Sequence, residues 1–140
     1  LHLSLRRQRQ MCIRDRPYEH RNLVTPDLGE MALLTLVSLT SPTERIEELT
    51  AEAEGFIYAV TVNGITGTDQ NFRQDLMEHL AKVKSASKIP VLAGFGISTS
   101  KQVKNFQQVC DGVVIGSKIV RSLEEQGTAK TGKLVAEIFQ

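Results

Sequence analysis

The chain has 140 residues, 41% of them hydrophobic and 24% charged, which is the composition of a globular protein with one hydrophobic core and too little chain for two domains. No run of about 18 apolar residues occurs, so the sequence contains no candidate transmembrane helix. Cys12 and Cys110 lie far apart and belong to no metal-ligand spacing, so we expect a reduced, cytoplasmic protein without a metal or other cofactor.

The net charge of +1 is unevenly distributed, because residues 1–16 carry five arginines against one aspartate. A basic nucleic-acid-binding arm and an arginine-rich targeting peptide are two interpretations of this segment. A third is favoured: MCIRDR, at 11–16, back-translates to a sequence that resembles the transposon-end adapter of DNA sequencing libraries. We therefore predict that residues 1–16 are non-native and disordered. The native part is then 17–140, an open fragment without an initiator methionine.

Alternating apolar and helical segments begin after residue 17. The first strand is predicted at 33–39, and Ser41-Pro42-Thr43-Glu44 then predicts a capping box with proline at the first helical position. This helix would end at Gly55, and its buried face would comprise Ile46, Leu49 and Ala53. A second strand at 56–62 leads through a polar, glycine-rich loop to a helix at about 74–85. The inward face of that helix is predicted to comprise Leu76, Leu80 and Val83.

A third strand is predicted at 89–93, followed by a helix with Thr99 as its N-cap and Gln102 at the third position. The buried side of this helix would comprise Val103, Phe106 and either Val109 or Cys110. A fourth strand at 112–115 precedes another helical segment. Four strands that are each followed by a helix predict a parallel sheet with right-handed crossovers.

Both a doubly wound sheet and a (β/α)8 barrel fit this order of elements. The glycine-rich loops after the last two strands favour the barrel, because barrels frequently bind phosphate with the loops after strands seven and eight. Backbone amides at Gly94, Gly96, Gly116 and Ser117 would surround the anion at the starts of the helices. Glycines that only allow close helix–sheet packing are the alternative. We therefore expect the C-terminal half of a TIM barrel.

Three motifs give the sequence a family resemblance: FIYAVTVNGITG, IPVLAGFGIST and DGVVIGSKIV. In this order they resemble the C-terminal half of the tryptophan synthase α chain, and PYEHRN resembles the stretch after that family's fourth strand. The resemblance implies that the four strands are the fifth to eighth of the barrel. It also implies a lyase of tryptophan biosynthesis, which cleaves indole-3-glycerol phosphate to indole and glyceraldehyde 3-phosphate by a retro-aldol reaction.

The resemblance also implies the site residues. Tyr58 would lie beside the substrate, Thr66 and Gly67 in a mobile loop, and Phe95 against the indole. The phosphate would be bound by amides near Gly96, Gly116 and Ser117. The family's catalytic acid and base are carboxylates on the second and third strand regions. No aspartate or glutamate from Glu19 onward matches them, so we expect the isolated chain to be inactive.

The implied partners are indole-3-glycerol phosphate and, for a full-length chain, the pyridoxal-phosphate-dependent β chain of tryptophan synthase in a heterotetramer, with no nucleic acid or membrane. Other interpretations stay open: Tyr58 as a core aromatic residue, Thr66 as a turn residue and Phe95 as a plug of the barrel end. A histidine-biosynthesis isomerase and a non-catalytic half-barrel that pairs with itself are the alternative functions.

Overall fold

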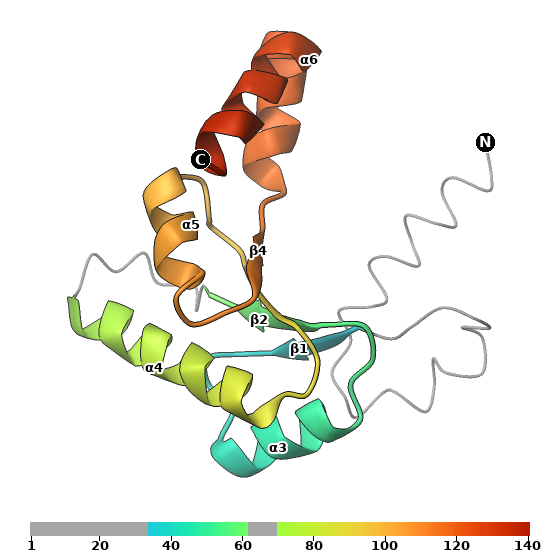
Figure 1. Ribbon diagram of the computed structural model, residues 1–140, viewed down its shortest axis with the longest axis vertical. Helices are drawn as coiled ribbons and strands as arrows, with labels where there is room; N and C mark the ends of the chain where they lie inside the picture. The colour runs from blue at the N-terminus through green and yellow to red at the C-terminus, as the bar shows by residue number, and fades with distance from the viewer. Residues whose placement is uncertain (1–33, 62–69) are drawn as a thin grey trace, which may run out of the picture.

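The computed structural model describes residues 34–61 and 70–140 (Figure 1). The predicted adapter segment and two predicted site residues, Thr66 and Gly67, lie outside these ranges. Within them, strands and helices alternate in the order β1 (Thr35–Val37), α3 (Thr43–Ala51), β2 (Ile57–Val60), α4 (Gln70–Ala86), β3 (Val91–Gly94), α5 (Ser100–Phe106), β4 (Gly112–Val114) and α6 (Ser117–Ile138).

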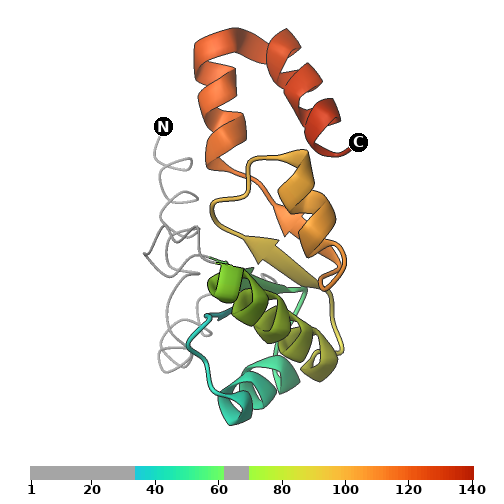
Figure 2. The same ribbon diagram turned by 90° about the vertical axis from the view of Figure 1, so that its left-hand side faces the viewer.

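The strands form one parallel sheet in chain order, β1-β2-β3-β4, as predicted. Helices α3, α4 and α5 lie on the same face of this sheet (Figure 2). Burial alternates along the strands, since Ile57 and Ala59 are buried whereas Tyr58 and Val60 are only half-buried. The amino-acid sequence of these strands is apolar on both faces. The second face is therefore built to be covered, as in the interior of a barrel.

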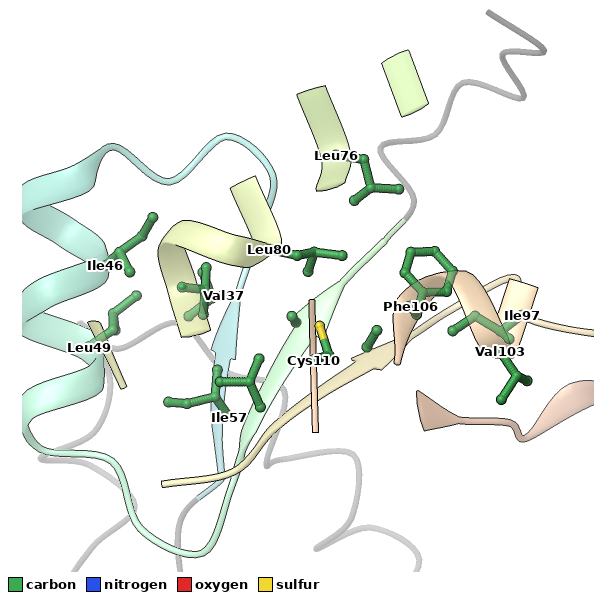
Figure 3. Packing of buried hydrophobic residues seen from close by; sticks show 14 of the residues in the cluster. Val37, Ile46, Leu49, Ile57, Leu76, Leu80, Ile97, Val103, Phe106 and Cys110 are labelled. Atoms are coloured by element: carbon green, nitrogen blue, oxygen red, sulfur yellow. The ribbon is translucent and has the colours of Figure 1, made fainter. Parts of the chain in front are cut away.

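The hydrophobic core lies between the sheet and the three helices (Figure 3). It joins Ile46 and Leu49 of α3 to Leu80 of α4, and Val103 and Phe106 of α5 continue it. The predicted inward positions of these helices are thus confirmed, except for Ala53, which lies beyond the end of α3 and is only half-buried. Cys110, the second candidate at the end of α5, is also buried, and burial raises the pKa of its thiol to about 11.

The helix ends show where local sequence determines structure. Thr99 caps α5 as predicted, because its side chain accepts from the Gln102 N–H and the Gln102 side chain accepts from the Thr99 N–H. The predicted capping box of α3 is wrong. Pro42 is the N-cap without a side-chain hydrogen bond, and the Ser41 hydroxyl lies 3.2 Å from the Ser38 hydroxyl instead.

Two further helix boundaries differ from the predictions. Helix α4 begins four residues earlier than expected, at Gln70, whereas α3 ends at Ala51 rather than Gly55. Helix α6 bends back on itself at Gly127, which has a φ of 74° (Figure 2). Among the described helices, none has the length and hydrophobicity of a membrane-spanning segment.

Asp111, in the segment that precedes β4, forms a hydrogen bond to the start of β3. Its carboxylate accepts a hydrogen bond from the Val91 N–H at 2.7 Å, and both of its oxygens lie 2.6 Å from Lys84 Nζ of α4. The Lys84 ammonium, with the Val91 N–H, lowers the pKa of this carboxyl below its ordinary value of 3.8. A carboxyl whose pKa is lower in the folded state than in the unfolded state stabilises the fold at pH values above its unfolded-state pKa. That contribution is lost as the pH falls through the folded-state pKa.

We expect Asp111→Ala to lower the free energy of unfolding by about 1–2 kcal/mol, because it leaves the Val91 N–H without its acceptor. Lys84→Met should cost less, about 0–1 kcal/mol, because it removes only an exposed ion pair. Chemical denaturation near pH 7 and at acid pH measures both. The deficit of Asp111→Ala should shrink as the pH falls below 3.8. An equal cost of the two substitutions, or a deficit that does not change with pH, would contradict this account.

Candidate functional site

A pocket of about 450 Å³ lies at the carboxyl ends of the strands, where the β3–α5 and β4–α6 loops meet. We call it the strand-end pocket. Its volume suits a small organic ligand. Five of the eight predicted site residues line it: Tyr58, Phe95, Gly96, Gly116 and Ser117. Gly94 is not among the lining residues, and Thr66 and Gly67 lie outside the described ranges.

Tyr58 explains why residue 94 is a glycine. The register pairs Tyr58 with Leu92 and Val60 with Gly94, so the tyrosine side chain extends along the sheet toward residue 94. A Cβ atom at Gly94 would overlap the Tyr58 hydroxyl oxygen and ring carbon Cζ. The side chain that occupies the space above Gly94 is therefore that of Tyr58. Glycine at 94 allows the tyrosine to reach the pocket.

Phe95 forms an aromatic wall of the pocket. Its ring meets the ring of Tyr58 edge to face, with centroids 5.6 Å apart and planes at 80°, a favourable arrangement for two aromatic rings. Phe95 is 53% exposed. Its backbone is left-handed, with a φ of 73°, a conformation that costs a non-glycine residue about 1–2 kcal/mol. An exposed aromatic ring on a strained backbone is typical of a binding site.

The N-termini of α5 and α6, which lie near the pocket, differ in whether a side chain accepts hydrogen bonds from their backbone N–H groups. The side chain of Gln102 already accepts from the N–H groups of Ser98 and Thr99 at the start of α5. Helix α6 begins after Gly116 without any side-chain cap. The Ile119 N–H already donates to the Gly116 carbonyl, so within this first turn the N–H groups of Ser117 and Lys118 have no acceptor among the described residues. These two N–H groups are open to a ligand, and the positive end of the helix dipole lies there. This makes Gly116 and Ser117 the better anion-binding positions.

Two cations at this pocket were not predicted from the sequence. Lys118 and Arg121 of α6 line it, and neither forms an ion pair with a residue in the described ranges. Their three-residue spacing on a helix could have indicated a shared face. No aspartate or glutamate of the described residues lines the pocket. Within the same ranges, no three His, Cys, Asp or Glu side chains gather as a metal site would require.

We expect Gly94→Ala to lower the free energy of unfolding by about 1–3 kcal/mol, because the new methyl group overpacks against Tyr58. In a Tyr58→Ala background the same change should cost much less. Gly116→Ala is the matched control, since no atom lies within 4 Å of a Cβ at this position. Chemical denaturation of the four variants measures these differences. A cost of Gly94→Ala that is the same with and without the Tyr58 side chain would refute this explanation.

Comparison with known proteins extends these observations to a family. Residues 8–139 match the sequence model described as tryptophan synthase alpha chain. This match includes residues 8–16, so the origin of residues 1–16 stays a prediction. A tryptophan synthase alpha chain from Listeria monocytogenes is 56% identical over 124 residues, which are 87% of this chain and 48% of the relative. One from Bacillus cereus is 49% identical over 127 residues, 89% of this chain and 49% of the relative.

Solved structures agree with the sequence relatives. The tryptophan synthase subunit alpha from Campylobacter jejuni superimposes with a TM-score of 0.72 at 32% identity, over 89% of this chain and 50% of that chain. A mutant alpha-subunit from Pyrococcus furiosus gives 0.71 at 25% identity, over 89% and 52%. The chain spans about half the length of the curated relatives it matches. The predicted half-barrel is thus confirmed, and the chain belongs to the tryptophan synthase alpha chain family.

Proposed function

We propose that this chain is the substrate-binding half of an α subunit that cleaves indole-3-glycerol phosphate to indole and glyceraldehyde 3-phosphate. The strand-end pocket is the observation that carries the proposal. An aromatic wall, Phe95 with Tyr58, and an uncapped helix start at Ser117 face one cavity of about 450 Å³. A ligand with an aromatic ring at one end and a phosphate at the other matches this pair of features.

The phosphate end is assigned to the amides of Gly96, Gly116 and Ser117. Oriented N–H groups and the positive end of the α6 dipole favour an anion there. Lys118 and Arg121 add two positive charges to the same pocket and have no acidic partner among the described residues. Two cations suit a phosphate monoester, which carries close to two negative charges at neutral pH.

The ring end is assigned to Phe95, whose exposed face offers contact area to an indole. Tyr58 supports that ring from the side. The family resemblance places Thr66 and Gly67 in a loop that covers the substrate. Both lie outside the described ranges, so this role stays a prediction. A Phe95 ring that contacts the indole on one side would help to orient the bond that breaks.

Retro-aldol cleavage needs two proton transfers. An acid delivers a proton to the indole ring carbon that carries the glycerol chain, a base removes the proton of the hydroxyl on the adjacent carbon, and the bond between these two carbons breaks. No carboxylate of the described residues lines the strand-end pocket. We therefore assign the acid and the base to the half of the relatives that this chain does not span. A full-length chain would also associate with the β chain of tryptophan synthase, as the family membership implies.

Fragment complementation tests this proposal. We expect the purified chain alone, and the N-terminal half of the Listeria monocytogenes relative alone, to cleave no indole-3-glycerol phosphate, because neither combines the phosphate site with the acid and base. A mixture of the two should close the barrel and show weak cleavage, measured as the release of indole. A mixture prepared with Phe95→Ala should be less active, because it lacks the aromatic wall.

Two results would contradict the proposal. Turnover by residues 17–140 alone would place the acid and base within this chain. A chain that forms a stable homodimer, binds phosphate and gains no activity from the added half would instead favour the self-pairing half-barrel. Family membership already argues against a histidine-biosynthesis isomerase, the other alternative.

A further inference from the structure

Thr61 is a buried polar residue beside the strand-end pocket, and no role was predicted for it from the sequence. It follows the last residue of β2 and is only 5% exposed. Its N–H donates to the Gly94 carbonyl at 2.9 Å, which extends the β2–β3 pairing by one hydrogen bond. Its hydroxyl lies 2.6 Å from the same carbonyl oxygen and 2.5 Å from that of Phe95. The single hydroxyl proton, shared between the two oxygens, therefore holds two successive carbonyl groups, those of Gly94 and Phe95.

The peptide groups held in this way determine the direction of the Phe95 side chain. Phe95 and Gly96 both have a φ of 73°, so the loop turns through two successive left-handed residues. Only the second is a glycine, and an L-residue such as Phe95 adopts this conformation only where its surroundings enforce it. The Gly94 and Phe95 carbonyl groups flank the φ and ψ torsions of Phe95. Hydrogen bonds that fix both carbonyl groups therefore enforce this conformation. The edge-to-face contact with Tyr58 depends on the same geometry.

We propose that Thr61 is a positioning residue: its buried hydroxyl keeps the turn at Phe95 and Gly96 left-handed, so that the Phe95 ring stands as a wall for the aromatic end of the ligand. Thr61 does not line the pocket, so it acts through Phe95. The inference rests on the proposed function for the identity of the aromatic ligand. The positioning of the ring by Thr61 is a property of the chain itself.

The test uses the chain completed with the N-terminal half of the Listeria monocytogenes relative. Thr61→Val keeps the shape and removes the hydroxyl, whereas Thr61→Ser keeps the hydroxyl. We expect Thr61→Val to weaken the binding of indole-3-propanol phosphate about tenfold, which is a typical effect of one lost hydrogen bond. The binding of glycerol 3-phosphate, which has no aromatic ring, should weaken less than about twofold. Thr61→Ser should retain most of the parent affinity for both ligands.

Two further variants separate positioning from general damage. Thr50→Val removes another buried threonine hydroxyl, which donates to the Glu47 carbonyl within α3 and does not line the pocket, so it should leave both affinities unchanged. In a Phe95→Leu background, Thr61→Val should have little further effect, since the ring it positions is absent. Equal losses for both ligands, or the same loss with and without the Phe95 ring, would overturn the inference.

A measurement without any ligand keeps the inference independent of the proposed function. The Tyr58 ring lies beside the Phe95 ring and should shift its NMR signals, which can be followed in protein with labelled phenylalanine. We expect Thr61→Val to remove that shift and Thr61→Ser to keep it. If the unsubstituted protein bound neither ligand, the proposed function would fail. Phe95 signals that are unchanged in Thr61→Val would overturn the positioning role, whatever the ligand data.

Discussion

The parallel pairing of β2 with β3 is the constraint on which the site depends. Its register runs from Ile57↔Val91 to Val60↔Gly94, and it places the carboxyl ends of both strands at one edge of the sheet. Tyr58 can then extend over Gly94, and Thr61 can reach the Gly94 and Phe95 carbonyls. A shift of one residue in this register would turn each of the two side chains, Tyr58 and Thr61, away from the face of the sheet that it now occupies. The aromatic wall and the turn that supports it therefore follow from strand register.

The same sheet explains why half a barrel is an incomplete unit. Its helical face is closed by the residues of the core, including Leu80 and Val83, which are fully buried. The opposite face carries apolar side chains such as Leu36 and Leu92 that are only half-buried. In a complete barrel these side chains would form packed interior layers with those of the other strands. Tyr58, which is in register with both leucines, lies on this same face, so folding and function of this chain are linked through it.

Local signals in the sequence predicted the features that depend on neighbouring residues. The capping box of Thr99 and Gln102 and the inward positions Val103 and Phe106 were confirmed, since both arise within one helix. Contacts between distant segments could not be predicted in this way. Nothing near Gly94 in the sequence indicates that a tyrosine from another strand fills its space. Thr61, in an apolar strand segment, is typical of an ordinary β-residue, so its hydrogen bonds to the next loop were missed.

The start of α6 is proposed to bind the phosphate of the ligand, and Ser117→Asp is the sharpest test of this assignment. In the chain completed with the relative's N-terminal half, this change places a negative charge where an anion is proposed to bind. Ser85→Asp, on the exposed part of α4, is the charge-matched control. Isothermal titration calorimetry should find that only Ser117→Asp weakens the binding of indole-3-propanol phosphate, by more than about tenfold. The affinity for free indole should stay unchanged. Unchanged affinity for both ligands in Ser117→Asp would contradict the account.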